Sequence, residues 1–509
     1  GLAAAGRLAA LDTADGLKAA AALVDREWWL TREFEVPTAW RGRGLRLRLG
    51  GVVGVAEVWL NGQHIGRTSG APEDTAELDL GPWATAGGTN TLALRLTAAP
   101  AEWSGVTWWQ TPTRATVLAP PVAWGDDGGG VCLPLGVHGA LEVQAVGPLQ
   151  LSPLRVETAL LDVAPAGEQA EVPARLRLRG DLTAAADAPD TAQVRVRLDS
   201  MVPDEPGLER VVDVNLQPGA TVPYEVELDV PATKVWWPAG WGRPALYRLT
   251  VSLEGAGVAS DVRTATVGFR DCGIGQNSLQ LNGRPWTPRL ARWKPVDRYL
   301  RASTDGTRRT LEAALAAGLN GLRVESGAAH ASPDLLDLCD ELGLVVVPEV
   351  PLDGGAPNLA RELVIAEARG WTDLAAGHPS VLGFALGHEG SPQSQVVAAA
   401  AEFAQAMPEA LLLSPTAREA GAQTWTWIRA AGDAALTLPA WQLNPVPTLP
   451  SRWSAGGRPA LDGTGELWPQ TAQWTDLGGS TAEPARLTAM MGDAADMAAL
   501  ARRLRWLQA

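Results

Sequence analysis

The sequence predicts a multidomain protein in which two antiparallel β units precede a (β/α)-type barrel. The chain has 509 residues, too many for one ordinary core. From about residue 27, apolar and polar residues alternate with period two in short segments cut by glycine and proline, which is typical of antiparallel strands. Later in the chain, helical patterns alternate with short apolar runs, which indicates a parallel sheet. The predicted units are an alanine-rich segment 1–26, β units 27–148 and 149–272, and a barrel 273–509.

Composition narrows the function classes. A formal net charge of −15 argues against nucleic acid as a partner, because phosphates would be repelled. The sequence contains no run of 18 or more uncharged apolar residues, so no transmembrane segment is expected. Residues 1–26 lack the basic start of a signal peptide, and the chain begins with glycine. We expect a soluble, bacterial-type protein, either cytoplasmic or exported with its signal removed.

The metal-ligating residue types form no recognisable pattern. Three cysteines lie far apart in the sequence, and five histidines are scattered without the spacing of a metal site. We therefore expect no metal and no cofactor. Tryptophan, by contrast, is abundant, with 22 residues against three tyrosines and four phenylalanines. Indole rings stack on sugars, although tryptophan also fills cores.

The first two units are justified by their strand patterns. "GVAEVWLNGQHIG" places Asn61-Gly62 between two alternating runs, which predicts a β-hairpin. Between residues 149 and 272, about seven strand-like segments, among them "ARLRLRGDL" and "YRLTVSL", predict an immunoglobulin-like β-sandwich.

The third unit is justified by apolar strands between helical segments. The strands expected are "NGLRV", "GLVVVPEV", "VLGFAL", "ALLLSP" and "RPALDG". In a (β/α) barrel, the chemistry lies at the carboxyl ends of the strands. Glu389 follows "VLGFAL" by three residues and is therefore expected at such an end.

Three long motifs carry a resemblance to a known family. They are "LRLRLGGVVGVAEVWLNGQHIG", "VWWPAGWGRPALYRLTVSL" and "HPSVLGFALGHE", in that order along the chain. Together they resemble glycoside hydrolase family 2, nearest to its β-mannosidase-like branch. The resemblance implies a sugar-binding-like jelly-roll β-sandwich for 27–148, the immunoglobulin-like domain for 149–272 and a (β/α)8-type TIM barrel for 273–509. It further implies a retaining exo-β-glycosidase acting on carbohydrate with a terminal β-linked sugar.

The resemblance also assigns two catalytic carboxylates. Glu389 matches the acid/base of the family, and Glu466, after the "GGRP" lead, is the candidate nucleophile, with Asp462 as a competitor. A retaining mechanism needs these carboxylates about 5–5.5 Å apart, so that one protonates the leaving oxygen while the other attacks.

Several positions depart from the family pattern. His388 stands where the family has asparagine, and Arg292 and Glu325 occupy other positions that differ. All tyrosines precede the second barrel strand, so the tyrosine that steadies the nucleophile has no counterpart. No eighth strand is recognised after Glu466, so the barrel looks truncated or incomplete.

These departures leave two interpretations open, and they favour the second. The chain is either an active glycosidase or a catalytically lapsed relative. The lapsed relative would serve as a carbohydrate-binding or structural subunit of a larger assembly. In that case a protein partner or a second copy would cover the incomplete barrel.

Further residues at strand ends are candidate substrate-binding groups, each with a structural alternative. Arg323 either contacts substrate or pairs with Glu389, which would then be a structural strand-end carboxylate, and Glu466 alternatively lies in a surface turn. Glu349 either orients substrate or forms a structural ion pair, and His378 is expected to cap or pack rather than catalyse. The remaining candidates either line a sugar pocket or belong to the core or surface; they are His388, Arg292, Trp293, Trp425 and Trp427.

Overall fold

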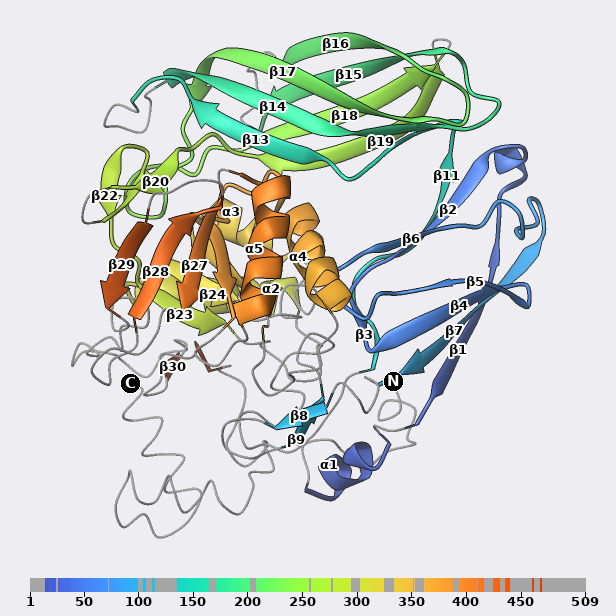
Figure 1. Ribbon diagram of the computed structural model, residues 1–509, viewed down its shortest axis with the longest axis horizontal. Coiled ribbons are helices and arrows are strands. Elements are labelled where there is room, and N and C mark those ends of the chain that lie inside the picture. Colours follow the sequence, from blue (N-terminus) through green and yellow to red (C-terminus); the bar gives the residue numbers. More distant parts are fainter. Residues whose placement is uncertain are drawn as a thin grey trace.

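The computed structural model describes most of the chain as three β-rich or α/β regions. Figure 1 shows the first unit in blue, a green β-sandwich across the top, and yellow to orange strands and helices below it. Helix α1 (Ala14–Ala21) precedes the first strand. The described residues are 14–23, 26–71, 73–98, 104–106, 112–114, 135–163, 171–201, 207–255, 258–275, 278–293, 303–324, 334–350, 352, 361–387, 393–408, 410–415, 424–430, 435–439, 460–461 and 467–468.

The first unit is built from antiparallel sheets, as its alternating pattern predicts. Every second residue of β4 is buried, namely Ala56, Val58 and Leu60, and these join the core between the sheets. One sheet has the order β1 (Trp28–Glu35), β7 (Thr89–Thr97), β4 (Val55–Leu60) and β5 (Gln63–Arg67). The others are β11 (Leu141–Val146), β2 (Gly44–Leu49) and β6 (Ala76–Asp79), the pair β10 (Gly136–Val137) and β3 (Val52–Val53), and the pair β8 (Ser104–Val106) and β9 (Pro112–Arg114).

The predicted hairpin at Asn61-Gly62 is confirmed. Both residues have positive φ, 51° and 82°, as the two-residue hairpin turn requires. Asn61 also fixes the neighbouring loop, because its Nδ2 donates to Trp83 O at 2.8 Å and its Oδ1 accepts from Thr91 N at 2.8 Å. The turn sets the register of β4 against β5.

The second unit is a two-sheet sandwich. Its strands alternate regularly between buried and solvent-facing residues, and their buried side chains form one continuous core. One sheet contains β12 (Leu149–Leu151), β14 (Glu171–Ala184), β13 (Arg155–Leu160) and β17 (Thr221–Lys234). The other has the order β16 (Leu208–Asn215), β15 (Thr191–Ser200), β18 (Tyr247–Gly255) and β19 (Val258–Val267).

The third unit contains a seven-stranded sheet with helices between its parallel strands. A small antiparallel sheet precedes it, formed by β20 (Cys272–Ile274), β21 (Leu279–Leu281) and β22 (Arg284–Trp286). The parallel strands are β23 (Leu290–Trp293), β24 (Gly321–Val324), β25 (Val345–Val350), β26 (Gly383–Leu386) and β27 (Leu411–Pro415). The helices are α2 (Thr304–Ala316), α3 (Leu335–Leu342), α4 (Arg361–Ala375) and α5 (Gln393–Ala406).

The sheet departs from the expected all-parallel order after β27. Strands β28 (Thr424–Arg429) and β29 (Ala435–Pro439) continue it as an antiparallel hairpin. Only residues 416–423 separate β27 from β28, whereas a parallel crossover needs a dozen residues or more. The expected strand "RPALDG" contributes β30 (Ala460–Leu461), which pairs with β31 (Leu467–Trp468) instead of joining the described sheet.

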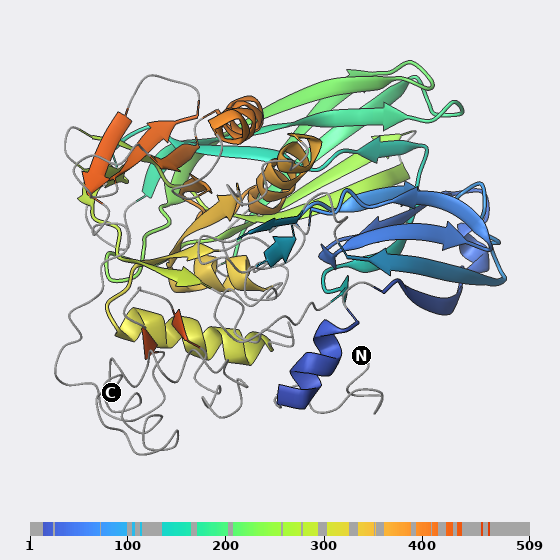
Figure 2. The same ribbon diagram turned by 60° about the horizontal axis from the view of Figure 1, so that its bottom comes forward.

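The helices of the third unit pack in pairs, and α2 begins with a side-chain cap. Ser303 Oγ accepts from Gly306 N and so caps α2. α2 packs beside α3, and α4 packs beside α5; Figure 2 shows α2, in yellow, well separated from the two orange helices. Among the described residues, no helix is both long and apolar enough for a membrane span.

The sandwich attaches to the amino-terminal side of the parallel strands. The Trp236 side chain is fully buried, and its Nε1 donates to Asp340 O at 3.0 Å. Arg270 donates to the carbonyls of Pro379 and Val381, just before β26. At Gly343, φ is +71° and an added Cβ would lie 2.6 Å from Ala239 N, so the approach itself requires glycine. Because the sandwich contacts the amino-terminal ends of the parallel strands, their carboxyl-terminal ends face away from it.

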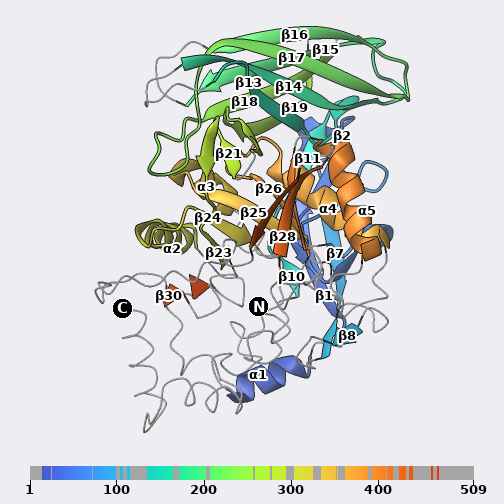
Figure 3. The same cartoon turned by 60° about the vertical axis from the view of Figure 1, so that its left-hand side comes forward.

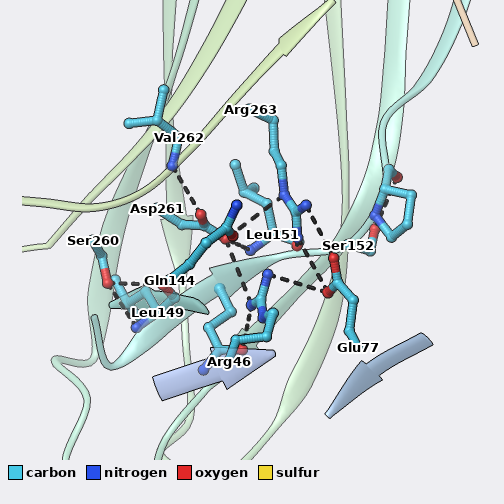
Figure 4. Close-up of polar contacts among 12 residues, drawn as sticks. Arg46, Glu77, Gln144, Leu149, Leu151, Ser152, Ser260, Asp261, Val262 and Arg263 are labelled. Carbon is cyan, nitrogen blue, oxygen red and sulfur yellow. Dashed lines mark hydrogen bonds and ion pairs between the residues drawn. The ribbon is translucent and has the colours of Figure 1, made fainter. Parts of the chain in front are cut away.

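A charged cluster joins the first unit to the sandwich (Figure 4). Arg46 on β2 contacts Glu77 on β6 at 3.1 Å and Asp261 on β19 at 3.8 Å. Arg263 on β19 contacts Glu77 at 3.2 Å and donates to Leu151 O at 2.9 Å. Since Arg46 is 7% exposed, its charge needs these partners, and the two units are held in one relative orientation.

Helix α4 contacts the first unit and lies within electrostatic range of the sandwich. A Cβ at Gly370 would lie 2.4 Å from the backbone of Glu73, so the helix meets that loop closely. One turn later, burial raises the pKa of the Asp373 carboxyl to about 6. The positive charge of Arg155 in the sandwich partly offsets this rise, and the negative charge of Asp74 adds to it.

The raised pKa of Asp373 predicts that Asp373→Asn stabilises the protein near neutral pH. The folded state binds more protons than the unfolded chain between about pH 4 and 6, so this carboxyl removes stability as pH rises through that window. Calorimetry should show a gain of ~1 kcal/mol for the variant at about pH 7.5 and a much smaller one at about pH 4. The exposed Asp187→Asn is the control; an equal effect of Asp373→Asn at both pH values would contradict the account.

Candidate active site

The carboxyl ends of β23 to β27 lie along one edge of the sheet, here called the carboxyl edge. Because parallel strands point the same way, residues that follow their last positions come together there. Trp293, Val324, Val350, Leu386 and Pro415 end these five strands. Any site built from strand ends is therefore formed on the side opposite the sandwich.

A buried ion pair lies at this edge. Arg323 on β24 and Glu349 on β25 are 7% and 6% exposed, and Arg323 Nε lies 2.8 Å from Glu349 Oε2. Neither charge would be tolerated alone at such burial. The described contacts thus include an ion pair between these two residues, and a role in orienting substrate stays a proposal.

The same arginine reaches the strand that leads to Glu389. Arg323 Nη2 donates to Gly387 O at 3.2 Å, so one guanidinium connects β24, β25 and the end of β26. Gly387 has φ of +70°, a left-handed conformation that favours glycine, and here the chain leaves the strand. His388 and Glu389 follow directly and lie outside the described residues.

The first strand contributes Arg292 and Trp293. Arg292 lies in register with Arg323, and its side chain is outside the described set. Trp293 is 1% exposed and packs in the core between sheet and helices. Its ring faces are thus covered by protein, which favours the core alternative over the sugar platform. Its Nε1 has no hydrogen-bond partner among the described residues.

The tryptophans of β28 lie at different depths along the strand. Trp425 pairs with Pro415, so its backbone is at the carboxyl edge, whereas Trp427 pairs with Leu413 nearer the middle. Their spacing of two places both on one face of the strand. The described residues include only their backbone, so pocket and core remain alternatives for both.

Glu466 and its competitor Asp462 also lie outside the described residues, whereas the two short strands that flank them are described. The hairpin β30–β31 brackets them, and β31 lies beside β23. Figures 1 and 3 show this hairpin below β23, on the side away from the sandwich. Leu461 and Leu467, which flank the segment with both carboxylates, therefore belong to a hairpin beside the first parallel strand.

His378 belongs to the opposite side of the sheet. Its Nδ1 lies 2.6 Å from Asp340 Oδ2, and Asp340 Oδ1 accepts from Ser380 N at 2.9 Å. Burial lowers the pKa of His378, but Asp340 and Asp337 outweigh this, and the pKa is raised overall. Sequence reasoning missed Asp340, because the two partners are 38 residues apart.

Asp337, Asp340 and His378 place three potential ligand atoms within 4.8 Å of one another. Two zinc ligands at about 2.0–2.1 Å in tetrahedral geometry would be about 3.3 Å apart. The 2.6 Å contact between His378 and Asp340 therefore has the length of a hydrogen bond.

Comparison with known proteins agrees with this architecture. A family model described as "Glycosyl hydrolases family 2" matches residues 161–270, and one described as "Glycosyl hydrolase 2 galactose-binding domain-like" matches residues 2–138. An exo-beta-D-glucosaminidase of Streptomyces avermitilis is 27% identical over 394 residues, covering 72% of this chain and 40% of that protein. A beta-mannosidase of Capra hircus is 28% identical over 181 residues, covering 32% of this chain and 20% of that protein.

Solved structures show the same fold at lower identity. The exo-chitosanase of Amycolatopsis orientalis has a TM-score of 0.63 and 21% identity, covering 82% of this chain and 48% of that one. The beta-D-mannosidase of Dictyoglomus thermophilum has a TM-score of 0.60 and 21% identity, covering 75% and 48%. This chain thus spans less than half the length of these relatives. Two domains of the chain match models of glycoside hydrolase family 2, and the order of the sheets and these relatives agree with that match. The chain therefore belongs to glycoside hydrolase family 2.

Proposed function

We propose that the carboxyl edge carries the active site of a retaining exo-β-glycosidase that removes a terminal β-linked sugar. Glu389 is the acid/base and Glu466 the nucleophile, with Asp462 as the alternative nucleophile. The observation that carries the proposal is the buried Arg323–Glu349 pair, whose guanidinium also binds Gly387 O. It fixes the backbone two residues before Glu389.

The reaction needs both carboxylates in turn. Glu389 donates its proton to the leaving oxygen while the Glu466 carboxylate attacks the anomeric carbon and forms a glycosyl-enzyme. Water then attacks the same carbon, Glu389 takes its proton, and Glu466 is released. A glutamate that must start protonated is helped by a negative nucleophile nearby, which disfavours a second charge.

The substrate class follows from the relatives. Proteins named exo-beta-D-glucosaminidase and beta-mannosidase both match this chain. We therefore propose β-glucosaminides and β-mannosides as the first substrates, which extends the β-mannosidase-like expectation. Arg292, Trp425 and Trp427 stay proposed sugar contacts, as does His388 in the position where the family has asparagine.

The second candidate is a family member without catalysis, acting as a carbohydrate-binding or structural subunit. The outer edges of β23 and β29 favour it, because no strand pairs with either among the described residues. Proteins normally cover or protect the unpaired edge strands of a sheet. A protein partner, a second copy or other residues of the chain would cover them.

Hydrolysis of aryl β-glycosides separates the two candidates. We expect turnover of the β-glucosaminide or the β-mannoside, and a fall of about 10²–10⁴ in kcat for Glu389→Gln, because the general acid is lost. Glu312→Gln, at an exposed position on α2, is the matched control and should leave kcat unchanged. Absence of turnover in the parent protein on every aryl glycoside would exclude the catalytic candidate.

The ion pair has its own test in Arg323→Met and the double variant Arg323→Met/Glu349→Leu. Arg323→Met leaves a buried carboxylate unpaired and should cost about 3–5 kcal/mol in urea unfolding, whereas the double variant should recover most of it. If the pair positions Glu389, kcat stays low in the double variant despite its restored stability. A loss below about 1 kcal/mol for Arg323→Met would show that the pair does not hold this edge.

A further inference from the structure

We propose that the outer face of the sheet β1–β7–β4–β5 binds a second stretch of β-linked oligosaccharide. This platform is built on Trp29 and Trp59 and lies in the first unit, whereas the candidate active site lies in the third. The proposal does not depend on hydrolysis at the carboxyl edge.

The strand register brings the two indoles together. β7 lies between β1 and β4, and Ala93 on β7 pairs with Thr31 on one side and Trp59 on the other. Trp29 is the next outward residue of β1, diagonal to Trp59. Because the alanine side chain is small, the two rings meet above it, with centroids 5.0 Å apart and planes tilted by 41°.

The platform is open to solvent at Trp29, whereas Trp59 is partly buried. Trp29 is 52% exposed, although indole is among the side chains that gain most from burial. Trp28, the neighbouring residue, instead points inward and packs against the core. The sheet therefore has its own buried face, and Trp29 is not needed to complete it.

Hydrogen-bonding groups surround the rings. The guanidinium of Arg95 lies 5.8 Å from the Trp59 centroid and 3.1 Å from Glu57. On the other side of Trp59, the His64 ring is edge-on at 5.0 Å, with Nε2 3.6 Å from Glu57. These contacts hold a guanidinium, a carboxylate and an imidazole in place around an aromatic surface.

This arrangement matches the chemistry of a pyranose chain. Such a sugar has an apolar C–H face, which suits an indole, and hydroxyls at its rim, which suit the charged groups. A stable protein interface instead needs about 800 Å² per partner and a centre depleted of charge. Here the other outward residues of β1 are polar, namely Thr31, Glu33 and Glu35.

Calorimetric titration with β-1,4-linked mannotetraose and glucosamine tetraose tests the platform. All proteins carry Glu389→Gln, so that neither saccharide is consumed. We expect Trp29→Ala to weaken binding of at least one saccharide about tenfold or more, and Trp29→Phe to keep most of the affinity. The saccharide that binds identifies the sugar. Trp83→Ala is the matched control, since Trp83 is 44% exposed on the same unit.

The proposal is overturned if neither tetrasaccharide binds, or if Trp29→Ala binds as tightly as Trp83→Ala. Near-ultraviolet circular dichroism checks that each variant is folded. Should Trp29→Ala unfold, Trp29→Thr replaces it, because a β-branched residue suits a strand. Unchanged affinity in that folded variant overturns the proposal equally.

Discussion

The buried ion pair between Arg323 and Glu349 is the constraint on which the carboxyl edge depends. Two charges at this burial must face each other, so β24 and β25 can adopt only a register that brings them together. The guanidinium then has a donor left for Gly387 O, at the point where β26 ends. One side chain thus connects three neighbouring strands close to their carboxyl ends.

The other two units support the sheet on the side opposite the carboxyl edge. Trp236 and Arg270 of the sandwich bond to backbone carbonyls near the start of β25 and β26, so the amino-terminal ends are closed by protein. The cluster around Arg46 and Arg263 fixes the first unit to the sandwich. A site at the strand ends benefits from such a rigid base, because catalytic groups need fixed positions.

Local patterns could predict much of this structure. Period-two alternation gave both β units, and Asn61-Gly62 gave the hairpin, because each depends on neighbours in sequence. The antiparallel return of β28 was missed, although the short connection 416–423 could have indicated it. Partners such as Asp340 for His378, or Asp261 for Arg46, could not be predicted, since no local rule joins residues so far apart. The proposed catalytic roles of Glu389 and Glu466 come from the family resemblance, and the structure describes only the strands that flank them.

Azide rescue of Glu389→Ala tests most directly whether Glu389 is the acid/base. With a dinitrophenyl β-glycoside, the leaving group departs without a proton and the glycosyl-enzyme still forms, whereas water then lacks its base. Azide needs no base. The account predicts that azide accelerates turnover and yields the β-glycosyl azide, with no such effect on the parent protein. Turnover of Glu389→Ala that azide leaves unchanged, or an α-glycosyl azide product, would contradict it.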